Sequence, residues 1–138
     1  MKLPTKILIV LLCLCLLLSG CKKAKPKPAA SLTYVTAVEV NYRYRSNQLH
    51  RSYTQCDKMD VILYYLYHLT PMGQPDEDPE QIRDDICKIT VTLSNGQQRI
   101  YRQIGSRYLS VDSHRWQKIQ KSQGSVLYHL INHMQSDG

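Results

Sequence analysis

A strictly alternating stretch constrains the fold of this chain more than any other feature. In TYVTAVEVNYRYR, residues 33–45, every second residue from Tyr34 onward faces one way, and this set is mostly valine and tyrosine. The residues between them include Glu39, Asn41 and Arg43. A period of two over about twelve residues is typical of a half-buried strand in an antiparallel sheet. The chain therefore has to build a sheet with one covered face.

The residues that follow return as a second strand and then change period. We expect the returning strand over 49–54, and Thr54 is of a type that favours the N-cap of a helix. Apolar residues then recur at helical spacing, which predicts a helix over 55–69 that Pro71 and Gly73 terminate. The expected buried face of this helix consists of Met59, Ile62, Leu63 and Leu66.

The strongest hairpin signal of the chain is Asn95-Gly96. Apolar residues alternate along 88–93, and the Asn-Gly pair favours the positive φ angles that a type I′ turn requires. Residues 97–104 are expected to form the returning strand, and 107–111 a further short strand. A closing helix is predicted over 123–135, with its apolar residues on one face.

These elements follow one another in the order ββα and then βββα. The order predicts an α+β fold, a twisted antiparallel sheet of about five strands with two helices packed on one face. A loop rich in acidic residues, 71–85, separates the two halves.

The first residues of the chain have the pattern of a secretory signal peptide. Two lysines precede twelve uninterrupted apolar residues, Ile7–Leu18. As a helix this run reaches about 18 Å and falls short of a bilayer core of about 30 Å. It ends at Leu18-Ser19-Gly20-Cys21, which resembles the lipobox of bacterial lipoproteins. An uncleaved anchor helix is the alternative.

In that family the signal is cleaved before the cysteine, whose thiol carries a diacylglyceryl group. The resemblance implies that residues 1–20 are removed and that Cys21 becomes the lipid anchor on the outer face of the cell membrane. In its pattern alone, the remaining domain also resembles the small domains carried by lipoproteins of Gram-positive bacteria, and no residue role follows from that likeness.

A tether and a small domain follow the anchor. Residues 21–31 are rich in lysine and proline, a composition typical of an extended spacer of about 30 Å. Residues 32–138 suit one domain with a single core. The whole chain has a net charge of +7, but residues 31–138 carry 12 Lys and Arg against 11 Asp and Glu. This balance excludes a nucleic-acid partner, which requires a positive surface.

Cys56 and Cys87 are the cysteines outside the signal and the anchor. Cys56 lies three residues before Met59, on the expected inward side of its helix, and Cys87 shares the strand parity of Ile89. Both side chains are therefore expected to face the core. Two alternatives stay open, a disulfide formed outside the cytoplasm or a pair of buried free thiols.

No group of residues has the spacing of a catalytic or metal site. His129 and His133 stand i, i+4 on the closing helix, but Leu130 occupies the place of the glutamate in a zinc protease motif. The acidic run within 76–85 lacks the order of a calcium loop. Asp112-Ser113-His114 are consecutive residues, an arrangement typical of a turn and not of a hydrolase triad. We therefore expect no metal and no cofactor.

The aromatic composition is unusual, with ten tyrosines, one tryptophan and no phenylalanine. Tyrosine suits half-exposed faces and interfaces, because its ring is apolar and its hydroxyl tolerates water. Helix 55–69 carries a second stripe opposite its buried face, where an exposed helix is normally polar. The stripe consists of Val61, Tyr64, Tyr65 and His68. It either packs beside the closing helix or forms a docking surface. Around Trp116 a partner could bind at a separate place.

These observations favour a membrane-anchored, extracytoplasmic lipoprotein that acts as a non-catalytic binding module for a protein of the envelope. The first alternative is an inhibitor or immunity-type protein that blocks an extracellular enzyme with loop 71–85. The second is a small hydrolase or metal-dependent enzyme, whose pocket would converge on His114, His129 or His133.

Overall fold

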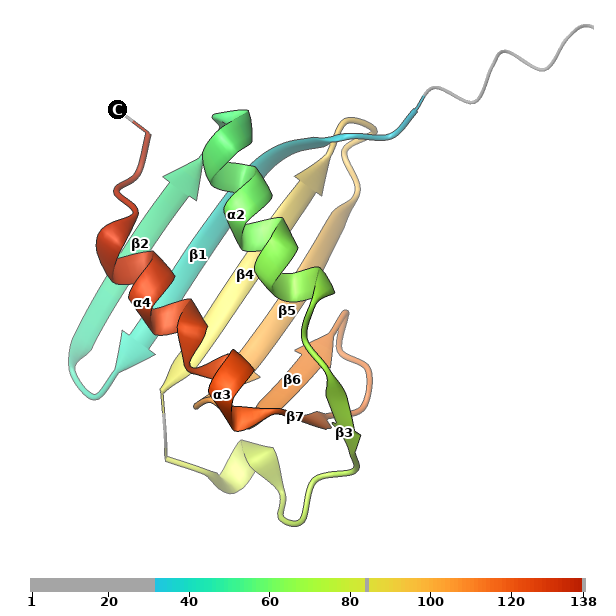
Figure 1. Ribbon diagram of the computed structural model, residues 1–138, viewed down its shortest axis with the longest axis vertical. Coiled ribbons are helices and arrows are strands. Elements are labelled where there is room, and N and C mark those ends of the chain that lie inside the picture. Colours follow the sequence, from blue (N-terminus) through green and yellow to red (C-terminus); the bar gives the residue numbers. More distant parts are fainter. Residues whose placement is uncertain (1–31, 84, 138) are drawn as a thin grey trace, which may run out of the picture. The chain divides into compact units, whose positions relative to one another are not determined.

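An antiparallel sheet with helices on one face forms the body of the protein (Figure 1). The computed structural model describes residues 32–83 and 85–137. The strands are β1 (Val35–Tyr44), β2 (Asn47–Tyr53), β3 (Pro71–Gly73), β4 (Ile86–Leu93), β5 (Gln98–Ile104), β6 (Tyr108–Val111) and β7 (Gln117–Ile119). The helices are α2 (Cys56–Tyr67), α3 (Lys121–Gly124) and α4 (Val126–His133), with a short 3₁₀ helix η1 (Pro79–Gln81).

Within the described residues the sheet has seven strands in the order β2-β1-β4-β5-β6-β7-β3. Every neighbouring pair is antiparallel. Figure 1 shows α2, α3 and α4 together on one side of this sheet. The prediction of an α+β fold, with helices on one face of an antiparallel sheet, is therefore confirmed.

The alternation along β1 sets the two faces of the sheet. Val38 and Val40 are fully buried, whereas Glu39 between them is exposed. β1 pairs with β2 on one side and with β4 on the other. β1 therefore lies inside the sheet, and it has one buried and one exposed face, as its period of two predicts.

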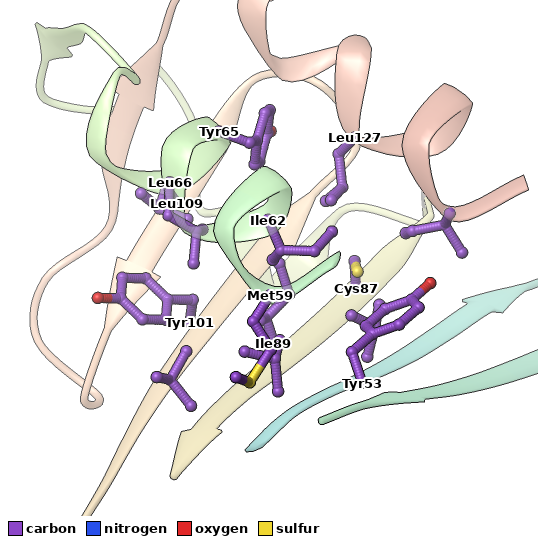
Figure 2. Packing of buried hydrophobic residues seen from close by; sticks show 14 of the residues in the cluster. Tyr53, Met59, Ile62, Tyr65, Leu66, Cys87, Ile89, Tyr101, Leu109 and Leu127 are labelled. Atoms are coloured by element: carbon purple, nitrogen blue, oxygen red, sulfur yellow. The ribbon is translucent and has the colours of Figure 1, made fainter. Parts of the chain in front are cut away.

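The core lies between the sheet and the two long helical segments. Ile62 of α2 is fully buried, as is Leu127 of α4. Met59, Ile62 and Ile89 of β4 belong to this core (Figure 2). Burying a side chain of this size contributes about 1.5–3 kcal/mol to stability, so these contacts fix the position of α2 on the sheet.

Two short strands, the edge strand β3 and its neighbour β7, account for the difference between about five predicted strands and the seven observed. β3 and β7 have three residues each and pair through Pro71 and Ile119. Three residues are too few to show a period, so the sequence pattern missed both strands. Pro71 fits here because β3 is an edge strand, where a missing N–H costs no ladder hydrogen bond.

The turn between β4 and β5 is not the predicted two-residue type I′ turn. Three residues, 94–96, form the loop, and the N–H of Gly96 donates to the carbonyl oxygen of Leu93 at 2.9 Å. Gly96 has a φ of +84°, whereas Asn95 does not adopt a positive φ. This geometry is the type I turn followed by a left-handed glycine, for which only one positive φ is needed.

The helix ends also differ from the prediction. Helix α2 has Gln55 as its N-cap, and no side chain of its own caps it. The N–H groups of Thr54 and Gln55 instead donate to the carboxylate of Asp137, at 2.5 and 2.7 Å. The closing helix predicted over 123–135 is divided at Ser125 into α3 and α4.

The face of the sheet opposite the helices is polar, and a loop lies over one end of it. The loop is residues 74–85, which include η1, and three ion pairs tie it to strands or to the segments beside them. They join Asp76 to Lys118 at 2.8 Å, Glu77 to Arg107 at 3.4 Å, and Glu80 to Arg102 at 3.1 Å. The acidic loop is therefore neutralised within the domain at these three carboxylates.

The predicted signal peptide, residues 1–20, the anchor Cys21 and the tether, residues 21–31, lie outside the described residues. The chain from Thr33 onward forms one compact unit. Among the residues that the structure describes, no helix has the length and apolar character needed to cross a membrane.

Candidate functional site

An apolar groove runs between α2 and the α3–α4 segment. Its volume is about 470 Å³, and ligand sites in proteins typically measure about 300–1,000 Å³. We call it the α2–α4 groove. Its lining residues are Asp60, Val61, Tyr64, Tyr65, His68, Leu69, Gln123, Val126 and Leu130.

The α2 wall of the groove is aromatic and solvent-exposed. Val61 is 39% exposed and Tyr64 is 66% exposed, although both are large apolar residues. The imidazole of His68 stacks on the ring of Tyr64, with 3.8 Å between ring centroids and an angle of 22°. The Nδ1 atom of His68 lies 2.8 Å from the carbonyl oxygen of Tyr64. The two rings therefore form a firm, flat wall at the end of α2.

The α4 wall is aliphatic. Leu127 and Ile131 face the core and are almost fully buried, whereas Val126 is 43% exposed. Leu130 stands four residues after Val126, one helical turn along the same side, and is half-buried. Helix α4 thus carries more apolar surface than its contact with the sheet requires.

Tyr65 forms the floor of the groove and belongs to a buried hydrogen-bond network beneath it. The hydroxyl of Tyr65 donates to Oε1 of Gln103 on β5. The Nε2 atom of Gln103 donates to the carbonyl oxygens of Gly105 and Gly124, at 2.9 and 3.0 Å. Burial raises the pKa of Tyr65 above its ordinary value, so this hydroxyl stays a donor. The network fastens both walls of the groove to the sheet.

Gly124 is required where α3 meets the sheet. A Cβ atom at this position would lie 2.2 Å from the carbonyl oxygen of Ser106. No side chain fits in that space, and the approach is what allows Gly124 to accept the hydrogen bond from Gln103.

One carboxylate marks the rim of the groove. Asp60 is exposed and forms no ion pair with any other described residue. At the other side, Oε1 of Gln123 accepts the N–H of Thr70 at 2.7 Å and is thereby engaged. The groove is consequently an apolar site with a single negative charge beside it.

All four residues of the predicted stripe on α2 line the groove, and three of them are exposed. Val61, Tyr64 and His68 lie together in the groove wall, but Tyr65 is only 6% exposed and belongs to the core. Leu63, expected in the core, is half-buried. Helix α2 is thus rotated about its axis from the predicted orientation, since the hydroxyl of Tyr65 finds a buried partner in Gln103.

The same rotation explains why Cys56 is exposed. At 100° per residue, turning Tyr65 inward turns Cys56 outward, and Cys56 is exposed while Cys87 is fully buried. The prediction that both face the core is therefore wrong for Cys56. Both are free thiols, and burial raises the pKa of Cys87 to about 12.

Trp116 does not belong to the groove. It is half-buried on the opposite face of the sheet, where its indole N–H donates to Glu80 at 3.1 Å. The guanidinium carbon of Arg102 lies 5.2 Å from the centroid of the indole ring. Trp116 thus packs with the acidic loop, apart from the stripe on α2.

The other residues considered for chemistry lie apart. Asp112 and Ser113 have φ angles of 51° and 62°, and Oδ1 of Asp112 accepts the N–H of Ile100 at 2.8 Å, so this segment is a turn, as predicted. His129 and His133 are exposed on α4. Within residues 32–83 and 85–137, no three His, Cys, Asp or Glu side chains come close enough to hold one metal ion.

No protein-family model, curated protein or solved structure matches the chain. Its function is therefore argued from its own residues.

Proposed function

We propose that this protein is a lipid-anchored, extracytoplasmic module that binds a segment of an envelope protein in the α2–α4 groove and catalyses no reaction. The observation that carries the proposal is the exposure of Val61, Tyr64 and Val126 around one hollow. Exposed apolar side chains that gather in a concave patch are typical of binding sites, whereas single ones are ordinary on any surface.

The charge beside the groove defines the partner's chemistry. Asp60 lines the groove and is exposed, and Lys58, two residues earlier on α2, is engaged by Asp137 at 3.0 Å. A complementary segment therefore carries bulky apolar side chains for the groove and a lysine or arginine beside them. The flat Tyr64–His68 pair favours such a cation or an aromatic ring.

Selection of peptides from a random display library on the full-length protein tests this site. We expect the selected sequences to combine bulky apolar residues with Lys or Arg, and to lose binding to the Tyr64→Ala variant. The matched control is Tyr67→Ala, since Tyr67 is equally exposed on the same helix, at 68%, and does not line the groove. Equal binding to both variants would exclude the groove as the docking site.

The membrane anchor is supported by the resemblance of Leu18-Ser19-Gly20-Cys21 to a lipobox. We expect labelled palmitate in cells to enter the wild-type chain and the Cys56→Ala variant, but not Cys21→Ala. Mass spectrometry of the native protein should show an acylated Cys21 as its first residue. A protein that keeps Met1 and carries no acyl group would end this part of the proposal.

The inhibitor alternative places the contact in loop 71–85. Three carboxylates of that loop are engaged by Lys118, Arg107 and Arg102, so they are less available to an extracellular enzyme. This pairing favours the groove over the loop as the contact surface.

A further inference from the structure

Three arginines surround a second hollow at the opposite side of the sheet from the helices. The hollow measures about 620 Å³ and is lined by Arg43, Arg45 and Arg83, with Ile82 and Ile86 among its apolar contacts. Arg43 is the ninth residue of β1, and Arg45 stands in the turn that follows. Arg83 precedes β4, and it reaches this place because Arg43 pairs with Ile86 across the sheet.

The positive charge of this hollow is not compensated within the described part of the chain. None of the three guanidinium groups forms an ion pair with another described residue. The carboxylate that lines the hollow is Glu80, whose oxygens accept hydrogen bonds from Arg102 at 3.1 and 3.3 Å. The hydrogen bond from Arg102 lowers the pKa of Glu80 below its ordinary value, and the carboxylate is already engaged by this partner.

Asp85, just before β4, does not line the hollow. Oδ2 of Asp85 accepts the hydroxyl hydrogen of Tyr42 at 2.9 Å, and Tyr42 lies on the helix-covered side, 5.2 Å from the ring of Tyr128. The arginines therefore present an excess of positive charge on a domain whose overall charge is nearly balanced.

The backbone and a neighbouring ring hold Arg45 in place. Its φ of +54° lies in the left-handed region, which is uncommon for a residue with a side chain. Its guanidinium carbon lies 5.0 Å from the centroid of the Tyr44 ring, a distance typical of a cation–π contact. Arg43 is carried by a paired strand. The three arginines are exposed, and their place around the hollow is set by the backbone of β1, the turn after it and the segment before β4.

We propose that this arginine hollow is a binding site for a phosphate-bearing anion, independent of the α2–α4 groove. The guanidinium group presents its N–H donors in a planar fork that matches two phosphate oxygens. Three such groups around one concave surface suit an anion with several oxygens and more than one charge. A soluble or polymeric phosphate and the headgroup of an anionic phospholipid share this chemistry.

The binding of sodium tripolyphosphate to the full-length protein in non-ionic detergent, followed by calorimetry, tests the site. The variant Arg43→Gln/Arg45→Gln/Arg83→Gln should bind at least about tenfold more weakly, since charge-assisted hydrogen bonds are lost. The control Arg99→Gln/Arg115→Gln/Lys121→Gln removes the same charge elsewhere, and its affinity should remain within about twofold of the wild type. The proposal is overturned if both variants bind more weakly to the same extent. It is also overturned if the wild type binds neither tripolyphosphate nor the vesicles described below.

A measurement on the wild type alone tests the site even if the triple variant does not fold. Titration with tripolyphosphate should shift the NMR signals of the Nε–Hε groups of Arg43, Arg45 and Arg83 before those of Arg99 and Arg115. Shifts that begin at Arg99 or Arg115 would contradict the assignment.

Flotation with vesicles then distinguishes the two sources of phosphate. Greater retention on phosphatidylglycerol than on phosphatidylcholine vesicles, lost in the hollow variant and kept in the control, identifies the lipid headgroup. Tripolyphosphate binding without this difference identifies a soluble or polymeric phosphate.

Discussion

The two faces of the sheet are covered by different kinds of contact. Helices α2 and α4 cover one face with side chains such as Ile62 and Leu127, which are fully buried. Loop 74–85 lies over part of the other through ion pairs such as Glu80–Arg102, whose side chains remain 49% and 36% exposed. Apolar burial contributes about 25 cal/mol per Å², whereas an exposed ion pair contributes about 0–1 kcal/mol.

The contacts on the helix-covered face therefore contribute most of the stability. The two proposed sites lie on different faces and differ in this respect. The α2–α4 groove is apolar and rests on a buried network that also fixes the helices. The arginine hollow lies on the face that contributes less to stability, so charge can gather there at little cost to the fold. Four substitutions measure this contrast.

The largest effect is expected for Ile62→Ala on the helix-covered face. Ile62 is fully buried, and truncating such a residue removes about 2–5 kcal/mol of the free energy of unfolding through lost burial and a cavity. Urea denaturation followed by circular dichroism measures it. Val61→Ala, one residue earlier and 39% exposed, is the control and should cost far less. Similar losses in the two variants would show that α2 is not oriented as described.

A smaller loss is expected for Tyr65→Phe. This change removes the hydroxyl that donates to Gln103, and a buried acceptor left without its partner costs about 1–3 kcal/mol. Thermal unfolding of this variant should be compared with that of Tyr64→Phe, which alters an exposed ring and should unfold like the wild type. If Tyr65→Phe were neutral, the floor of the groove would not depend on this hydrogen bond.

The third prediction concerns pH and the start of α2. The N–H of Thr54, followed by that of Gln55 and by Lys58, lowers the pKa of Asp137 from 3.8 to about 2. The folded state thus favours the ionised carboxyl, so its contribution to stability is complete above about pH 4 and is lost as the pH falls towards about 2. Unfolding curves over this range should show a shallower decline for Asp137→Asn than for the wild type. Identical slopes would mean that Asp137 does not hold the start of α2.

The smallest effect is expected for Glu80→Gln, on the face of the sheet opposite the helices. Its bond to Arg102 is exposed to solvent, so the variant should lose less than about 1 kcal/mol of stability. Raising the salt concentration should reduce the difference further, because exposed charges are screened. A loss as large as that of Ile62→Ala would remove the contrast between the two faces.

Local periodicity predicted most of the architecture. The alternation that ends near Tyr44 gave β1 its faces, and the helical spacing of Met59, Ile62 and Leu66 gave α2 its place on the sheet. The three-residue strands β3 and β7 escaped prediction, because no period can be seen in so few residues.

The sites were harder to predict than the fold. Val61, Tyr64 and His68 were found from their spacing on one helix, but Tyr65 was assigned to the wrong side. Its inward position depends on Gln103, 38 residues further along the chain. In the same way, Thr54 has the residue type of an N-cap, yet Asp137 from the far end of the domain binds the N–H groups there.

The sequence by itself determined the order and type of the main elements and the covered face of the sheet, because periodicity is a property of neighbouring residues. Only the tertiary structure decided the rotation of α2, the meeting of α2 and α4 around a groove, and the gathering of Arg43, Arg45 and Arg83. These features join segments that are distant in the chain, and strand pairing and core packing bring such segments together. No local pattern of residues specifies that outcome.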